Sequence, residues 1–157
     1  MAWIQPIYDR TQEDVLNAKD TLTRWIASNP TIFTDLKGCL NATDLNRIEG
    51  NIDYLSETLN SFLYHNEVNS KQWERVDLPN VLDLQRIVSN LEILFNAFYR
   101  PTSATELPTN MSSFDDINRL EQNIEAIKQL LDSMQNFFPL SGICIAGDRT
   151  LLPLRRY

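Results

Sequence analysis

Apolar residues recur along most of this chain at alternating steps of three and four residues. That spacing places them on one narrow stripe of an α-helix and is typical of helices packed in a bundle. Residues 41–64, 80–100 and 113–137 follow the pattern, so we predict a bundle helix over each range. The three apolar stripes are Leu45, Ile48, Ile52, Leu55, Leu59 and Phe62, then Leu84, Ile87, Leu91, Leu94 and Phe98, then Ile117, Leu120, Ile124, Ile127, Leu131 and Met134.

The three stretches are copies of one motif. Each reads Asp, aliphatic, Asn or Gln, Arg, aliphatic, two variable residues and Asn, in a fixed phase with its apolar stripe. Because the phase is shared, corresponding layers can meet when the helices pack. The recurring polar residues are Asp44, Arg47 and Asn51, then Asp83, Arg86 and Asn90, then Asp116, Arg119 and Asn123.

These repeated polar residues flank the apolar stripes, and two interpretations of them stay open. They can form a ladder of charges and hydrogen bonds that ties neighbouring helices together. Alternatively, they can form a ligand site that is made three times over. Repetition favours the structural interpretation, because a catalytic site rarely needs three copies.

A cap residue precedes each copy. Asn41, Asn80 and Ser113 stand three residues ahead of the repeated Asp. An Asn or Ser there can accept a hydrogen bond from the first helical turn, and the Asp can accept one from the N–H of the cap residue. We therefore predict a capping box at the start of each of the three helices.

The N-terminal part of the chain predicts an arm and a further helix. Residues 1–10 are expected to be extended, because Pro6 excludes a helix interior. Residues 11–29 predict a first helix, which Asn29-Pro30 ends. Its apolar face is Val15, Ala18, Leu22, Trp25 and Ile26. With this helix the bundle has four main helices.

The C-terminal part predicts a small β-structure. Residues 141–157 contain two short apolar runs on either side of Gly147-Asp148, which is typical of a β-hairpin. A lone hairpin is marginally stable. We therefore expect it to form a small sheet with the arm from Trp3 to Tyr8. The prediction is one all-α domain over residues 1–157, a bundle of four main helices with a C-terminal β-hairpin and tail.

The two segments between the repeat helices are long for helix connections. Two roles are open for them. They can be ordered by packing Trp73 or Leu107 onto the bundle, or they can be surfaces for partners.

Composition narrows the class of protein. The chain has 157 residues, with 43% hydrophobic and 22% charged residues, as in ordinary globular domains. Its formal charge of -7 argues against a nucleic-acid partner, since such binding depends on Lys and Arg. No apolar run is long enough to predict a membrane span, and the first residues do not resemble a signal peptide. We expect Cys39 and Cys144 to be reduced, and their spacing matches no metal site.

The sequence predicts no catalytic, cofactor-binding or metal-binding residues. The single histidine, His65, has no cysteine or carboxylate at ligand spacing. Glycine-rich phosphate loops and nucleophile motifs are missing. We therefore expect a protein that is not an enzyme and carries no cofactor.

Two stretches carry a resemblance to a known family. They are Ile7-Tyr8-Asp9-Arg10-Thr11-Gln12-Glu13-Asp14-Val15 and the run from Leu40 through Asp44-Leu45-Asn46-Arg47-Ile48-Glu49-Gly50-Asn51 to Leu55. They resemble small structural proteins of phages and prophages of Gram-positive bacteria, associated with the tail, baseplate or tail fibre. The segments 79–99 and 141–154 look like the same family, so the resemblance spans nearly the whole chain. It carries over no catalytic residues.

The resemblance implies a virion structural or adaptor protein that acts through protein–protein assembly in the tail. Its expected location is the virion, with the host cytoplasm during assembly, and its expected partners are other virion proteins and further copies of itself. The alternative is a cytoplasmic prophage-encoded binding or regulatory protein. The candidate interface residues are Trp3, Ile4, Trp73, Thr150, Arg155, Arg156 and Tyr157.

Overall fold

The computed structural model describes residues 2–28, 34–109 and 112–141. They form four α-helices: α1 (Gln12–Ser28), α2 (Ala42–Ser61), α3 (Val81–Ala97) and α4 (Phe114–Ser141). Within these ranges there is no β-strand. The predicted all-α class and the four helices are therefore confirmed.

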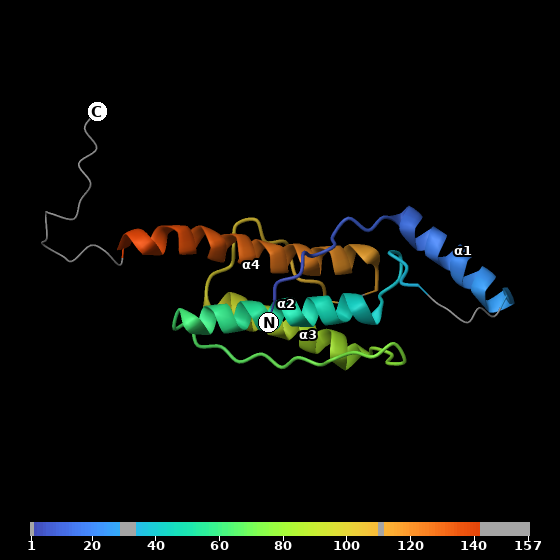
Figure 1. Cartoon of the computed structure of the whole chain (residues 1–157), viewed down its shortest axis with the longest axis horizontal. Coiled ribbons are helices and arrows are strands. Elements are labelled where there is room, and N and C mark those ends of the chain that lie inside the picture. The colour runs from blue at the N-terminus through green and yellow to red at the C-terminus, as the bar shows by residue number, and fades with distance from the viewer. Residues whose placement is uncertain (1, 29–33, 110–111, 142–157) are drawn as a thin grey trace, which may run out of the picture.

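Helices α2, α3 and α4 form the bundle and run in the same direction (Figure 1). Parallel neighbours need connections that travel back along the full length of a helix. The chain does this with two extended return segments, residues 65–79 after α2 and residues 101–109 after α3 (Figure 1). The arm, residues 2–10, is a third extended segment of the same kind. The bundle is thus three parallel helices with extended chain along its outside.

The core is made by the three predicted apolar stripes. Leu55, Leu94 and Ile127 occupy one repeat position and are 0%, 0% and 1% exposed. Each such side chain contributes about 1.5–3 kcal/mol by burial. The remaining core residues that are fully buried are Leu45, Ile48, Ile52, Leu59, Ile87, Leu91, Leu120, Ile124 and Leu131.

The predicted caps are confirmed at all three repeat helices. The backbone N–H of Asn41 donates to Asp44 over 3.1 Å, and that of Asn80 donates to Asp83 over 3.2 Å. At α4 the N–H of Ser113 donates to Asp116 over 3.0 Å, and the N–H of Asp116 donates to Ser113 Oγ over 3.2 Å. The repeated Asp is therefore the third residue of each helix and closes the capping box with the cap residue.

Helix α1 departs from the predicted arrangement, because it lies beyond the N-terminal ends of the bundle helices instead of among them (Figure 1). Ala18 is its one buried residue, and Ile26 is 84% exposed. The physical reason is that the arm already fills the groove between α2 and α4. Helix α1 is fixed at its start, where Gly38 approaches so closely that a Cβ there would lie 2.1 Å from the Asp14 carbonyl oxygen.

One prediction about the C-terminal part is also corrected. Helix α4 does not end before Pro139 but continues to Ser141, which was predicted to begin the hairpin. A proline removes one backbone donor, and here that loss does not end the helix. The predicted hairpin strands over 143–154 lie outside the described residues. The arm, their predicted partner, lies against α2 and α4.

Truncating the shared core layer tests the register of the three helices. Leu55→Ala, Leu94→Ala or Ile127→Ala should each lower the free energy of unfolding by about 2–5 kcal/mol, because each leaves a cavity. Asn96→Ala, at an exposed position of α3, is the control and should cost less than about 1 kcal/mol. Denaturant melts measure both. Equal costs for core and control variants would contradict the register.

Candidate functional site

A cluster of four buried, charged side chains lies where the arm, α2 and α4 meet. Arg10, Asp44, Arg47 and Glu121 come from the arm, α2 and α4, and are 5%, 5%, 8% and 0% exposed. The Glu121 carboxylate accepts from Arg10 Nη1 over 2.9 Å and from Arg47 Nε and Nη2 over 3.0 and 2.8 Å. Asp44 Oδ1 accepts from Arg10 Nη2 over 2.9 Å and from Arg47 Nη2 over 2.6 Å. Two positive and two negative charges thus balance.

Hydrogen bonds and neighbouring charges keep Asp44 and Arg47 ionised inside this cluster. Burial by itself would raise the pKa of Asp44, but hydrogen bonds from Arg47 and Asn41 and the charge of Arg10 hold that pKa below its ordinary value. Burial would lower the pKa of Arg47, whereas its bonds to Glu121 and Asp44 raise it. Removing one partner of such a buried pair leaves an uncompensated charge, which is strongly destabilising.

A second cluster repeats this arrangement between α2 and α3. Glu49 is 2% exposed and accepts from Arg86 Nη1 over 2.9 Å. It also accepts from the indole N–H of Trp73 over 3.1 Å. As at Glu121, one buried carboxylate joins an Arg of the neighbouring helix to the extended segment that lies between the two helices.

Asparagine side chains hold the backbone of the extended segments. Asn51 Oδ1 accepts the N–H of Ile4 over 3.0 Å, and Asn51 Nδ2 donates to the Ile4 carbonyl over 2.7 Å. Asn118 makes the same pair of bonds with Arg10, over 3.2 and 2.9 Å. The arm is therefore bonded at two points, once to α2 and once to α4.

The first return segment is held in the same way. Asn90 of α3 bonds the N–H and carbonyl of Asn69 over 3.1 and 2.8 Å. Asn46 of α2 accepts a hydrogen bond from the Trp73 N–H over 2.7 Å and donates one to the Trp73 carbonyl over 2.8 Å. In both grooves the final Asn of the motif comes from one helix, and the Asn at its third position comes from the other. We call each Asn side chain that bonds both the N–H and the carbonyl of one residue an asparagine clamp. The repeat thus encodes a pair of clamps in each of these two grooves. The spacing of residues within a single helix does not indicate this pairing.

The nine repeat residues have three tasks, and Arg119 alone among them performs none of the three. Asp44, Asp83 and Asp116 cap the helices, while Arg47 and Arg86 pair with the buried glutamates. Asn51, Asn90 and Asn123 hold extended segments, although Asn123 reaches only the Thr105 hydroxyl, over 3.1 Å. Arg119 pairs with Asp116 of its own helix. The ladder interpretation accounts for these contacts, but the bonds connect helices to extended chain more often than helices to each other.

The candidate interface residues fall into three groups. Trp73 is 3% exposed and bonded to Glu49, so its burial is at odds with a partner surface. Trp3 is half-buried against Tyr54, with ring centroids 5.7 Å apart, whereas Ile4 is 54% exposed. Thr150, Arg155, Arg156 and Tyr157 lie outside the described residues.

Sequence reasoning missed the residues at the centre of each cluster. Glu49 and Glu121 occupy the sixth motif position, which varies between copies and was read as unconstrained. Arg10 was named only as part of the arm and of the stretch that carries the family resemblance, and no charged partner was predicted for it. A signal was present, since the sixth position is Glu in two of the three copies.

Among residues 2–28, 34–109 and 112–141 no group of His, Cys, Asp or Glu could hold a metal ion. The same part of the chain contains no helix long and apolar enough to cross a membrane. Comparison with known proteins gives no match: no family model fits the sequence, and no curated protein or solved structure is significantly similar.

Acid titration tests the charge cluster. The folded-state pKa of Asp44 lies below its ordinary value. The stability that Asp44 contributes is therefore present above about pH 4 and is lost as the pH falls through the folded pKa. Wild-type stability should fall steeply below about pH 4, and Asp44→Asn should flatten that slope by up to about 1.4 kcal/mol per pH unit.

The control for this titration is Asp20→Asn, which changes an exposed carboxylate of α1. It should leave the pH slope of the unfolding free energy unchanged. An Asp44→Asn protein with the wild-type slope would contradict the role of Asp44 in the cluster.

Proposed function

We propose that this protein is a non-enzymatic structural or adaptor component of a phage or prophage virion, acting through protein–protein assembly in the tail. The resemblance of the segments around Asp9-Arg10-Thr11 and Asp44 to Leu55 to phage structural proteins motivates the proposal. The surface described below supports an assembly role.

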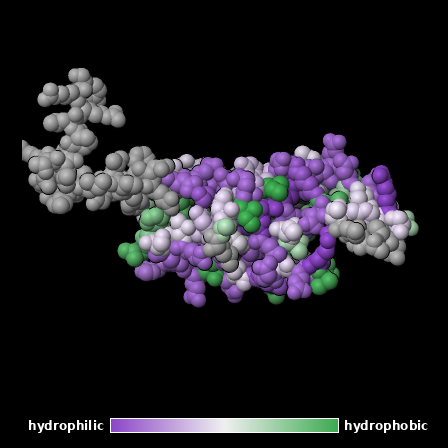
Figure 2. All heavy atoms as spheres, in the orientation of Figure 1, coloured by the Kyte–Doolittle hydropathy of each residue, from purple (hydrophilic) through white to green (hydrophobic). Residues whose placement is uncertain are grey.

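The observation that carries the proposal is the placement of α1. This helix stands outside the bundle and leaves large apolar side chains exposed: Leu16 at 57%, Leu22 at 40% and Ile26 at 84%. Much of the surface in view is hydrophilic (Figure 2). Exposed apolar side chains that lie together on one element often mark a site of protein–protein contact.

A cleft beside α1 extends this surface. It has a volume of about 290 Å³ and lies between α1 and the end of the first return segment. Leu22 and Trp25 line one side, and Leu78, which is 88% exposed, lines the other. A partner side chain seated there would contact the bundle and α1 together. The assembly surface of the proposed adaptor is therefore α1 with the cleft at its base.

Purified particles test this proposal. Mass spectrometry of particles induced from a bacterium that carries the gene should detect the chain at stoichiometric copy number. Ile26→Lys should lower incorporation roughly tenfold, the effect of about 1.4 kcal/mol. Its melting temperature should not change, because Ile26 is 84% exposed.

The matched control is Thr23→Lys, which adds the same charge to an exposed position of the same helix. It should be incorporated like the wild type. Wild-type particles that lack the chain would overturn the virion assignment and favour the cytoplasmic regulator. Equal incorporation of all three proteins would overturn the α1 surface.

A further inference from the structure

The groove between α3 and α4 departs from the other two grooves. Where α2 and α4 carry Asn at the third motif position and Glu at the sixth, α3 carries Gln85 and Val88. No buried carboxylate therefore faces Arg119, whose side chain pairs with Asp116 and stays 41% exposed. Asn123 is fully buried, yet its Oδ1 has no hydrogen-bond partner among the described residues.

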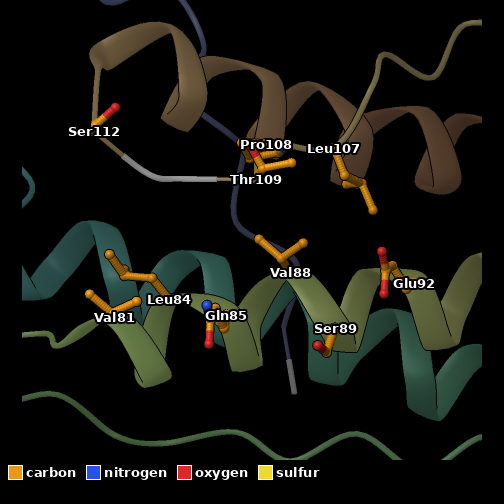
Figure 3. A pocket seen from close by; sticks show the side chains of 10 residues that line it. All are labelled: Val81, Leu84, Gln85, Val88, Ser89, Glu92, Leu107, Pro108, Thr109 and Ser112. Carbon is orange, nitrogen blue, oxygen red and sulfur yellow. The ribbon is translucent and has the colours of Figure 1, made fainter.

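A cavity of about 670 Å³ lies on the α3 side of this groove. Figure 3 shows Val81, Leu84 and Val88 of α3 on one side and Leu107 and Pro108 of the second return segment on the other. The polar lining residues are Gln85, Ser89, Glu92, Thr109 and Ser112. Val81 is 66% exposed, so the apolar wall opens to solvent.

The other two grooves show what such a site accommodates. Each holds an extended segment with a buried side chain facing the helices: Trp73 in the α2–α3 groove and Pro6 in the α2–α4 groove. In the α3–α4 groove the second return segment covers part of the surface and leaves the cavity beside it. The α3–α4 groove thus holds one extended segment, whose Pro108 is buried, and has room beside it for a further apolar segment. Because Val88 takes the place of Glu, the wall of the cavity carries no buried carboxylate at position 88 that an occupant would have to pair.

The chain contains a segment with this chemistry, Leu151-Leu152-Pro153-Leu154, flanked by Arg149, Arg155 and Arg156. Residues 142–157 hold three Arg and one Asp, a formal charge of +2. Since the whole chain carries -7, the remainder carries -9. A basic, apolar segment is therefore complementary to an acidic body whose apolar groove includes Glu92.

The reach of the chain fits this site. By the motif register, residues 81–92 of α3 lie level with residues 114–125 of α4. A rise of about 1.5 Å per residue places that level about 24–40 Å from Ser141 along the helix. At about 3.3 Å per residue, extended chain after Ser141 reaches about 33 Å at Leu151 and about 43 Å at Leu154. The segment can therefore return to the cavity, as the other two return segments do.

We propose that residues 151–154 dock into the α3–α4 groove of their own chain. Their leucine side chains fill the cavity against Val81, Leu84 and Val88. The flanking arginines lie toward Glu92. The α3–α4 groove then holds two extended segments, the second return segment and residues 151–154.

Hydrogen exchange of the full-length chain tests this docking. In the wild type, amides of residues 150–155 should exchange at least tenfold more slowly than in a synthetic peptide of residues 142–157. Val88→Lys should remove that protection, because it places a positive charge in the apolar wall, where it also repels the flanking arginines. Val81→Lys should do the same without risk to the fold, since Val81 is 66% exposed. Exchange of α2 amides confirms that each variant is folded.

The control is Val76→Lys, the same change at a position that is 83% exposed and outside the groove. It should leave the protection of residues 150–155 as in the wild type. Peptide-like exchange of this segment in the wild-type chain would overturn the proposal, as would protection that survives both groove variants. Protection that disappears on dilution would also overturn it, since the occupant would then be a second copy.

Discussion

The fold depends on one buried carboxylate that three parts of the chain share. Glu121 of α4 accepts hydrogen bonds from Arg47 of α2, from Arg10 of the arm and from the backbone N–H of Ile7, the last over 2.6 Å. Its side chain is 1% exposed. A carboxylate at such a position is tolerable only while its cationic partners stay in place. The contact therefore couples the position of the arm to the packing of two helices.

The asparagine clamps follow from the parallel arrangement of the helices. Parallel helices need long returns, and an extended return without a neighbouring strand has unpaired backbone groups. An Asn side chain offers one acceptor and two donors, so it can take the place of a strand partner for one residue. The clamps at Ile4, Asn69, Trp73 and Arg10 do this. Each copy of the motif therefore supplies asparagines that can satisfy the unpaired N–H and carbonyl groups of an extended segment.

The sequence predicted the elements well and their arrangement less well. Heptad spacing and cap residues are local signals, so the repeat helices and their capping boxes were predictable. The parallel direction depends on the length of the connections, because short loops join antiparallel helices. The long segments that now hold Trp73 and Leu107 against the bundle were that signal. The apolar face of α1 indicated a fourth bundle helix, but it could not reveal that the arm occupies the available groove.

The buried clusters were less predictable, since their partners lie far apart in sequence. Arg10 and Glu121 are separated by 111 residues, and Arg47 and Glu121 by 74. The spacing of the motif shows which residues share one edge of a helix, but it does not show which other helix that edge contacts. What the repeat did contain was the difference between copies, with Glu at the sixth position of the first and third copies and Val88 in the second. That difference separates the two grooves with a buried carboxylate from the groove with a cavity.

The most direct measurement of this account is the stability of Glu121→Gln, with hydrogen exchange of the arm read in the same protein. The substitution keeps the shape of the side chain and removes the charge that Arg10 and Arg47 share. The expected result is a loss of about 3–5 kcal/mol in the free energy of unfolding and faster exchange at Ile4 and Ile7. Glu125→Gln, one turn further along α4, should cost less than about 1 kcal/mol. A Glu121→Gln protein as stable as the wild type, with a protected arm, would contradict the central role of this carboxylate.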